Sequence, residues 1–367
     1  MATTTLSQQP ISLNDTPVEP LSSNGALKPR DVEAVFYYIK KNATAEELAG
    51  DKSLGASPHT WGAVGTQIVH KTQDVADRGS DFTLTKHGFT YVKHASAFKE
   101  EDYADQEKIL KEYRPETEAL VKKVTGASKV KVFNHMTRTS KGQVPTPTDS
   151  YKQDHGQVYR VHVDQNTPTV EALVHQYYPE EAEELLKKRV QVVNVWRPIS
   201  TVLRDPLGVA DLHSQSPDDV AAIHVYMPDG TITTTINGCR ENPNHKFYYK
   251  YKQQPDEPVL FLQFDNQMGQ HCFGRCAHSA FKDPEFEALP ARRSIECRTL
   301  VFYDEPEPVV PTETEDTIPG GQDKAEEIYN DDFPLERQGP GTMQVKPSRH
   351  TGVQEAKKRS IYRKIAA

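Results

Sequence analysis

The chain has 367 residues, a formal net charge of −8 and a hydrophobic fraction of 36%. This length allows one large domain or two small ones, and the low hydrophobic fraction predicts an ordinary core with polar, disordered ends. The negative charge gives no general reason to expect nucleic acid or a membrane as a partner. Four cysteines do not make a disulfide scaffold, and no secretory signal or long apolar run is present. We therefore expect a cytoplasmic protein.

The first third of the chain mixes helical and extended patterns. Residues 1–30 are rich in Ser, Thr, Pro and Asn, which predicts a disordered N-terminal segment. The apolar run at 34–39 predicts a strand, and residues 82–96 predict two short extended pieces. Residues 99–125 predict a helical stretch that is interrupted at Pro115 and ended by the glycine that follows it.

The remainder of the chain is mostly β-prone and ends in a polar tail. Strands are predicted at 129–138 and 158–164, and a helix at 179–190, where acidic residues come first and basic residues last. Many short β-rich runs fill 190–305, which predicts a sandwich or barrel flanked by helices. Residues 306–367 form an acidic and then basic stretch without apolar periodicity, which predicts a disordered tail.

A histidine and an aspartate stand two positions apart in the predicted strand at 158–164. Side chains alternate along a strand, so His162 and Asp164 point to the same face. One imidazole and one carboxylate in this arrangement can bind adjacent positions of a divalent metal, and a distant second histidine would complete a 2-His-1-carboxylate triad. Taken alone, the pair is a weak signal, because a strand histidine without a ligand role is the more common explanation.

Two later motifs strengthen the metal hypothesis. His278 precedes a predicted strand, and Arg292 and Ser294 follow it on another, where they share a face with Arg298. An arginine and a serine at this spacing can grip a small dicarboxylate. The order of the three motifs indicates an Fe(II)/2-oxoglutarate oxygenase. We expect an α+β fold with a double-stranded β-helix (jelly-roll) core and flanking helices over residues 31–305.

The same region resembles a known family. The motifs that carry the resemblance are NVWRPI (194–199), PLGVAD (206–211), NPNHKFYY (242–249), FLQFDN (261–266), AHSAF (277–281) and RRSIECRTLVFYD (292–304). They look like the fungal gibberellin-desaturase-like family, also called the AsaB-like hydroxylase/desaturase family. The resemblance covers roughly 34–304 and implies a 2-oxoglutarate-dependent dioxygenase that acts on a small molecule of the secondary-metabolite type.

The resemblance also implies roles for single residues. His162, Asp164 and His278 match the iron ligands of the family, and Arg292 with Ser294 matches the co-substrate clamp. The implied cofactor is Fe(II), with 2-oxoglutarate and O2 as co-substrates. No further side chain is assigned a catalytic role.

Four residues are weaker candidates for binding. Asn194 is a candidate for the co-substrate, although a structural role for a buried asparagine is an equal alternative. Trp196, Tyr249 and Arg138 are candidates for the substrate. Core packing is the alternative for the two aromatic residues, and a surface position is the alternative for the arginine.

The sequence leaves several points open. The main alternative to an enzyme is a non-catalytic jelly-roll protein that binds a metabolite or a partner, and a zinc hydrolase with the same three ligands is a further one. Arg298 competes with Arg292 as the clamp. The substrate, the choice between hydroxylation and desaturation, the oligomeric state and the role of the tail are not specified.

Overall fold

The computed structural model describes residues 19–20, 29–49, 64–138, 157–226, 232–268, 274–304, 335–338 and 342–345. Most of the N-terminal segment and of the tail that we predicted to be disordered therefore lies outside the described residues. The exceptions are residues 19–20, 29–30, 335–338 and 342–345. Among them, the guanidinium of Arg30 bonds to Asp283 at 2.5 Å and to Glu285 at 2.7 Å. The ordered part of the domain thus begins before residue 31.

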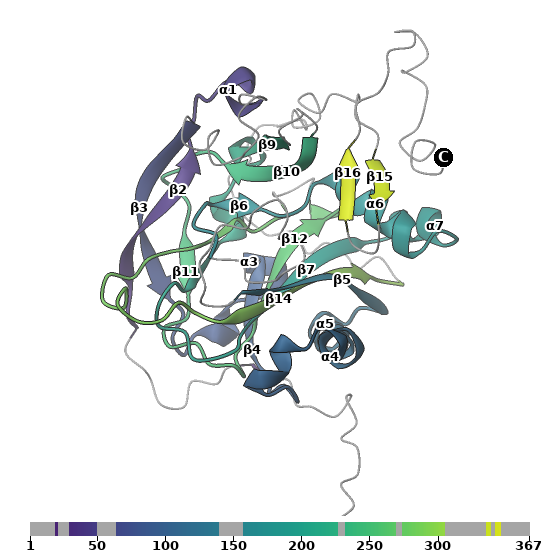
Figure 1. Cartoon of the computed structure of the whole chain (residues 1–367), viewed down its shortest axis with the longest axis horizontal. Helices are drawn as coiled ribbons and strands as arrows, with labels where there is room; N and C mark the ends of the chain where they lie inside the picture. Colours follow the sequence, from purple (N-terminus) through teal and green to yellow (C-terminus); the bar gives the residue numbers. More distant parts are fainter. Residues whose placement is uncertain are drawn as a thin grey trace, which may run out of the picture.

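Two large β-sheets form a barrel-like body (Figure 1). The first sheet has the order β1-β4-β12-β7-β14-β5, and the second has the order β2-β3-β11-β8-β13-β6-β10-β9. The strands of the first sheet are β1 (Glu19–Pro20), β4 (Phe89–Lys93), β5 (Lys129–Arg138), β7 (Val190–Pro198), β12 (Val259–Asp265) and β14 (Ser294–Phe302).

The second sheet holds shorter strands and carries two of the predicted metal ligands. Its strands are β2 (Val32–Ile39), β3 (Gly65–Asp74), β6 (His162–Val163), β8 (Leu207–Ala210), β9 (Val220–Tyr226), β10 (Ile232–Cys239), β11 (Phe247–Tyr249) and β13 (His278–Ala280). Two further strands, β15 (Leu335–Gln338) and β16 (Thr342–Val345), pair with each other. The predicted strand at 158–164 is thus reduced to the two residues of β6.

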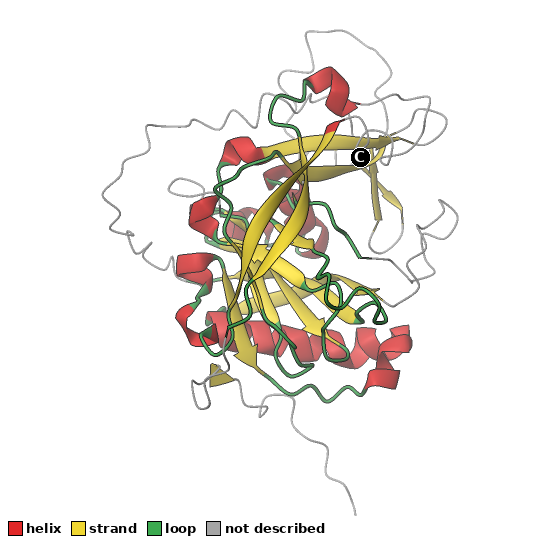
Figure 2. Ribbon diagram, turned by 90° about the vertical axis from the view of Figure 1, so that its left-hand side faces the viewer, coloured by secondary structure: helices red, strands yellow, loops and turns green. Residues whose placement is uncertain are grey.

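The first sheet is buried on both faces at its centre. Every residue of β7 and β12 is buried, as the near-continuous apolar runs VQVVNVW and VLFLQF require. One face looks into the barrel, and helices α4 (Gln106–Lys108) and α5 (Arg114–Thr125) cover the other, as Figure 2 shows. Tyr113 packs there against Ile295 of β14.

The helical stretch at 99–125 is irregular, but not at the proline. A 3-10 turn, η3 (Glu100–Ala104), and a π-helical turn, η4 (Ile109–Tyr113), precede α5. Pro115 lies in the first turn of α5, where its missing N–H is tolerated. Gly126 ends the helix with φ 71°, as predicted. The helical stretch is instead broken at Asp105, whose backbone is extended, and it continues from Gln106 to Thr125 through the π-helical turn.

Other local predictions need correction. The helix predicted at 179–190 is only the short α7 (Ala182–Leu186), whereas α6 (Thr167–Tyr177) was not predicted. Its N-terminal signal is Asn166, whose side-chain oxygen accepts the Thr169 N–H at 2.9 Å. The remaining helical pieces are α1 (Ala45–Ala49), η2 (Gly79–Asp81), α3 (Leu84–His87), η5 (Leu212–Ser214) and η6 (Pro217–Asp219). In the described part of the chain, no helix is long and apolar enough to cross a membrane.

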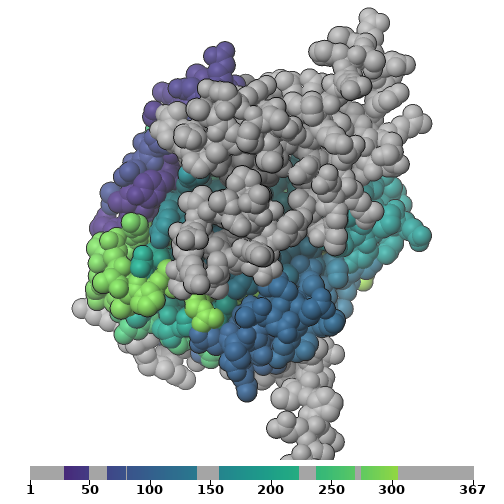
Figure 3. All heavy atoms as spheres, in the orientation of Figure 1, coloured from purple at the N-terminus to yellow at the C-terminus, as the bar shows by residue number. Residues whose placement is uncertain are grey.

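A buried polar chain links the paired strands β2 and β3, purple and blue on one flank in Figure 3, to the segments that precede β9 and β11. The Tyr38 hydroxyl lies 3.0 Å from His70 Nε2 and 3.0 Å from His245 Nδ1, and His245 Nε2 lies 3.1 Å from Asp219. Since the carboxylate only accepts, His245 donates from Nε2, Tyr38 donates to its Nδ1, and His70 donates to Tyr38. Burial, and next the proximity of His245, lower the pKa of His70 to about 4, so its ring is neutral.

We predict that Tyr38→Phe lowers the free energy of unfolding by about 1–3 kcal/mol, because two buried imidazole nitrogens lose their shared partner. Denaturant unfolding measures this loss. Tyr37→Phe is the matched control, because Tyr37 is the neighbouring residue on β2 and is 36% exposed; it should change stability by less than about 0.5 kcal/mol. Equal effects of the two substitutions would contradict the role of the polar chain.

Candidate metal centre

Strand pairing brings the two predicted histidine ligands together. His278 on β13 is the direct antiparallel partner of His162 on β6, and their ring centroids lie 4.3 Å apart. Asp164 follows β6; its Oδ1 is 3.7 Å from His162 Nε2, and its Oδ2 is 3.9 Å from His278 Nε2. The potential ligand atoms of the three residues all lie within 4.8 Å of one another. The sequence predicted this group, and the fold places its members side by side.

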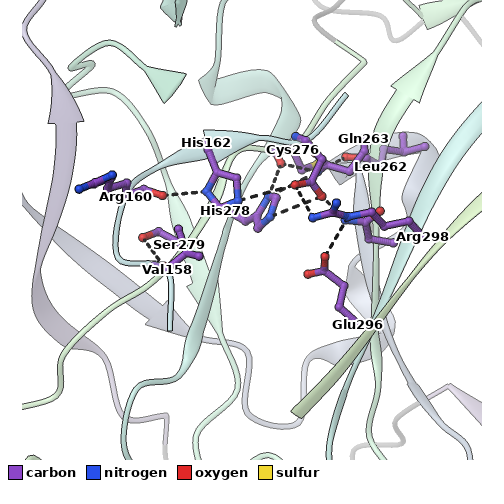
Figure 4. A network of polar contacts seen from close by, with 12 residues as sticks. Val158, Arg160, His162, Leu262, Gln263, Cys276, His278, Ser279, Glu296 and Arg298 are labelled. Carbon is purple, nitrogen blue, oxygen red and sulfur yellow. Dashed lines mark hydrogen bonds and ion pairs between the residues drawn. The ribbon is translucent and has the colours of Figure 1, made fainter. Parts of the chain in front are cut away.

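Both histidines present an unprotonated Nε2 to the aspartate. The Nδ1 atom of His162 lies 2.8 Å from the Arg160 carbonyl oxygen, and that of His278 lies 3.2 Å from the Cys276 carbonyl oxygen (Figure 4). A carbonyl oxygen only accepts, so each Nδ1 carries the proton and each Nε2 has a free lone pair. Burial, and next the neighbouring ring, lower the pKa of His162 to about 4. Neutral rings of this tautomer are the form that binds a metal.

The third ligand is an ionised carboxylate held from the opposite sheet. Asn194 Nδ2 donates to Asp164 Oδ2 at 2.5 Å, and Arg298 Nη2 donates to Oδ1 at 2.9 Å. Asn194 and Arg298 are direct partners on β7 and β14. Burial opposes the charge of Asp164, but the charge of Arg298 and the hydrogen bond from Asn194 outweigh it, so the pKa of the carboxyl lies below its ordinary value.

The donor set fits a divalent transition metal. Two neutral imidazoles and one carboxylate on one side of a site leave further coordination positions open, which suits non-haem Fe(II). A pocket adjoins the group. Its lining includes both histidines, Arg138, Trp196, Arg292 and Glu296.

Arg292 and Ser294 have polar atoms that lack partners among the described residues. Both residues are buried, and Arg292 Nε and Ser294 Oγ make no hydrogen bond there. The guanidinium lies 5.0 Å above the Trp196 ring and donates to the Asp205 carbonyl oxygen. Burial, and next Arg138, lower the pKa of Arg292 to about 9. A bound anion would satisfy these groups and offset the cost of burying the charge.

Arg298 is engaged elsewhere. Besides its bond to Asp164, its Nε donates to Glu296 at 3.2 Å. The guanidinium of Arg298 therefore lies between two carboxylates, one of which belongs to the predicted metal ligand Asp164. The sequence had placed Arg298 on the correct face of β14, but only the pairing of β14 with β7 reveals its contact with Asp164.

The other predicted binding residues divide into two groups. Arg138 and Trp196 line the cavity, whereas Asn194 contacts the ligand carboxylate. Tyr249 does not line that cavity; it packs against Phe281 in the core, and its hydroxyl donates to the Arg30 carbonyl oxygen at 2.5 Å. The proposed substrate contact of Tyr249 is therefore replaced by the core-packing alternative.

Comparisons with known proteins agree with the site. A family model described as Oxidoreductase/YMDC permease-like domain matches residues 36–302. The Alpha-ketoglutarate-dependent dioxygenase phiK of a fungal species is 39% identical over 236 residues, which cover 64% of this chain and 84% of that protein. The Hydroxylase/desaturase efuI of Hormonema carpetanum is 32% identical over 276 residues, covering 69% and 92%.

A solved structure is also similar. A variant of the iron and alpha-ketoglutarate-dependent endoperoxidase NvfI superposes with a TM-score of 0.63 at 26% sequence identity. The match covers 74% of this chain and 97% of the solved chain.

We predict that His162→Ala, Asp164→Ala and His278→Ala each weaken the binding of Co(II), used as a spectroscopic substitute, by at least about 100-fold. Loss of an outer contact to a ligand already costs about 10- to 100-fold, and loss of a ligand should cost more. Isothermal titration calorimetry measures the affinity. The exposed His213 supplies the control His213→Ala, which should bind as wild type. Wild-type affinity in any ligand variant would remove that residue from the site.

Proposed function

We propose that this chain, which belongs to the Oxidoreductase/YMDC permease-like family, is an Fe(II)/2-oxoglutarate-dependent dioxygenase that hydroxylates or desaturates a small molecule. The observation that carries the proposal is the group of His162, Asp164 and His278 beside a cavity with a buried arginine. The non-catalytic alternative has no support from the relatives, which are named as dioxygenases or hydroxylase/desaturases.

A jelly-roll core is the fold that we propose for the site. Within the first sheet the order β5-β14-β7-β12 is contiguous, and within the second the order β11-β8-β13-β6 is contiguous. Along the chain these eight strands alternate between the two sheets, except that β8 and β11 follow each other within the second sheet. This is the order of two interlocked Greek keys. This topology supports the proposal because β6 and β13 become neighbours, although they are distant in sequence.

The residues of the site would have three separate roles in the reaction. The triad holds Fe(II), which together with 2-oxoglutarate and O2 supplies the oxidising chemistry. Arg292 and Ser294 bind the distal carboxylate of 2-oxoglutarate, because a guanidinium and a hydroxyl suit that anion. Asn194 and Arg298 orient the ligand carboxylate.

The substrate class is inferred from the cavity and from the relatives. A pocket adjoins the triad, and Arg138 in its lining offers a cation to any acidic group that the substrate carries. The named relatives come from fungi, and a secondary metabolite is the substrate type that we propose. The expected cytoplasmic location stays a prediction.

The proposal is tested by adding Fe(II) and 2-oxoglutarate to the full-length protein without oxygen. We expect a weak visible charge-transfer band, followed by succinate formation when air is admitted. Asp164→Ala is the control and should give neither signal. A zinc hydrolase would give no band, and a non-catalytic binding protein would give no succinate, so either result would contradict the proposed activity.

We predict that Arg292→Leu weakens 2-oxoglutarate binding by about 2–4 kcal/mol, or roughly 30- to 1,000-fold, because a buried charge-assisted contact is lost. Titration of the charge-transfer band measures the affinity. Co(II) binding should change little. Arg293→Leu is the matched control, because Arg293 pairs with Glu100 at the surface.

Arg298→Leu should show the opposite behaviour, with weakened Co(II) binding, because Arg298 contacts Asp164. If Arg298→Leu weakens 2-oxoglutarate binding at unchanged metal affinity, and Arg292→Leu does not, the clamp has been assigned to the wrong arginine.

A further inference from the structure

A buried amide lies in the middle of an apolar strand beside the metal centre. Strand β12 reads VLFLQFD, and Gln263 is its fully buried amide, with 0% of its surface exposed. A side-chain amide without hydrogen bonds is costly in such surroundings. Its partners therefore indicate why a glutamine stands at this position.

Gln263 connects two segments that carry predicted ligands. Its Oε1 accepts the backbone N–H of Asp164 at 2.7 Å. Its Nε2 donates to the carbonyl oxygens of Cys276 at 2.7 Å and Leu262 at 2.9 Å. The orientation of the amide is fixed, because one end meets an N–H and the other meets two carbonyl oxygens. Figure 4 shows Gln263 beside Cys276 and His278.

The Cys276 carbonyl group that contacts Gln263 also contacts His278. The Cys276 carbonyl oxygen accepts from Gln263 and also from Nδ1 of His278, at 3.2 Å. The same oxygen thus receives the amide and orients the imidazole. A shift of this carbonyl group would turn the Nε2 atom of His278 relative to Asp164.

The pairing of β6 with its neighbouring strands does not extend to Asp164, so other contacts hold this residue. Strand β6 ends at Val163, and its pairing with β13 is the one register pair His162 and His278. Asp164 lies just beyond this pair, so its backbone is held by the Gln263 contact rather than by β13. The separation between Asp164 and His278 consequently depends on the Gln263 contact to the Asp164 backbone, together with Asn194 and Arg298, which hold the carboxylate.

We infer that Gln263 is a positioning residue that sets the relative placement of Asp164 and His278, and with it the affinity and geometry of the metal site. This inference rests on the metal centre proposed above. Gln263 itself is no ligand, because both ends of its amide are used by backbone groups.

Gln263→Leu is the informative substitution. It keeps a buried side chain of similar size but leaves the Asp164 N–H and one bond of the Cys276 carbonyl oxygen without a partner. Gln263→Glu retains an acceptor for Asp164 and loses donors to the two carbonyl oxygens. Its effect should fall between wild type and the leucine variant, and it replaces the leucine variant if that protein does not fold.

A second buried glutamine provides the matched control. Gln191 on β7 donates to Asp265 at 2.6 Å and accepts from Tyr303 at 2.6 Å. It belongs to the same sheet as Gln263 and makes comparable buried bonds, but none of these contacts involves a ligand segment. Gln191→Leu should therefore lower the melting temperature without altering the metal site.

The experiment compares Co(II) binding in the full-length proteins by calorimetry and by the visible d–d spectrum. We expect Gln263→Leu to bind Co(II) roughly 10- to 100-fold more weakly, with a changed spectrum. Gln191→Leu should bind within about twofold of wild type despite its lower melting temperature. Wild-type affinity and spectrum in Gln263→Leu, or in Gln263→Glu if only that variant folds, would overturn the inference. Equal weakening in Gln191→Leu would overturn it too.

The wild-type titration distinguishes failure of this inference from failure of the proposed function. If wild-type protein does not bind Co(II), or if His278→Ala binds it equally well, the metal centre itself is wrong. If wild-type protein binds Co(II) and His278→Ala does not, the metal centre stands. The Gln263 variants then test the role of Gln263 alone.

Discussion

The carboxylate of Asp164 joins the two sheets across the interior of the protein, and the geometry of the site depends on how it is held. Asp164 follows β6 in the second sheet, whereas Asn194 and Arg298 reach it from β7 and β14 in the first. A buried carboxylate is costly unless charge and hydrogen bonds compensate it, and these two residues supply both. The requirement to hold this group therefore fixes the distance between the sheets at this point.

Strand β14 then links the metal centre to the proposed co-substrate end of the cavity. Arg298, Glu296 and Ser294 are alternate residues of β14 and share its inward face. Arg298 contacts Asp164, Glu296 both bonds to Arg298 and lines the cavity, and Ser294 lies beside the buried Arg292. One strand thus carries residues that contact the metal ligand Asp164 and residues beside the proposed 2-oxoglutarate clamp. The regular spacing of residues along this strand fixes the distance between the two groups.

Short sequence motifs predicted the parts of the site that depend on local spacing. Alternation along a strand predicted that His162 would lie with Asp164 and Arg292 with Ser294, although Asp164 and Arg292 lie just outside β6 and β14. The distant ligand was found because His278 stood in the expected order, but its pairing with β6 is a long-range contact that no local pattern contains.

Residues that act across the sheets could not be predicted in this way. Gln263 carries only a general signal, a polar residue inside an apolar run. Its partners are Asp164, which follows β6, and Cys276, which precedes β13. The contact of Arg298 with Asp164 depends on the register of β14 against β7. Tyr249 was assigned to the substrate because aromatic residues line pockets and cores alike, and only the tertiary structure separates these roles.

The most direct test is anomalous diffraction from crystals grown without oxygen in the presence of Mn(II) and 2-oxoglutarate. The account predicts one strong anomalous peak within bonding distance of His162 Nε2, His278 Nε2 and an Asp164 oxygen, with the distal carboxylate of 2-oxoglutarate on Arg292. A peak at another group of side chains, or 2-oxoglutarate bound away from that peak, would contradict it.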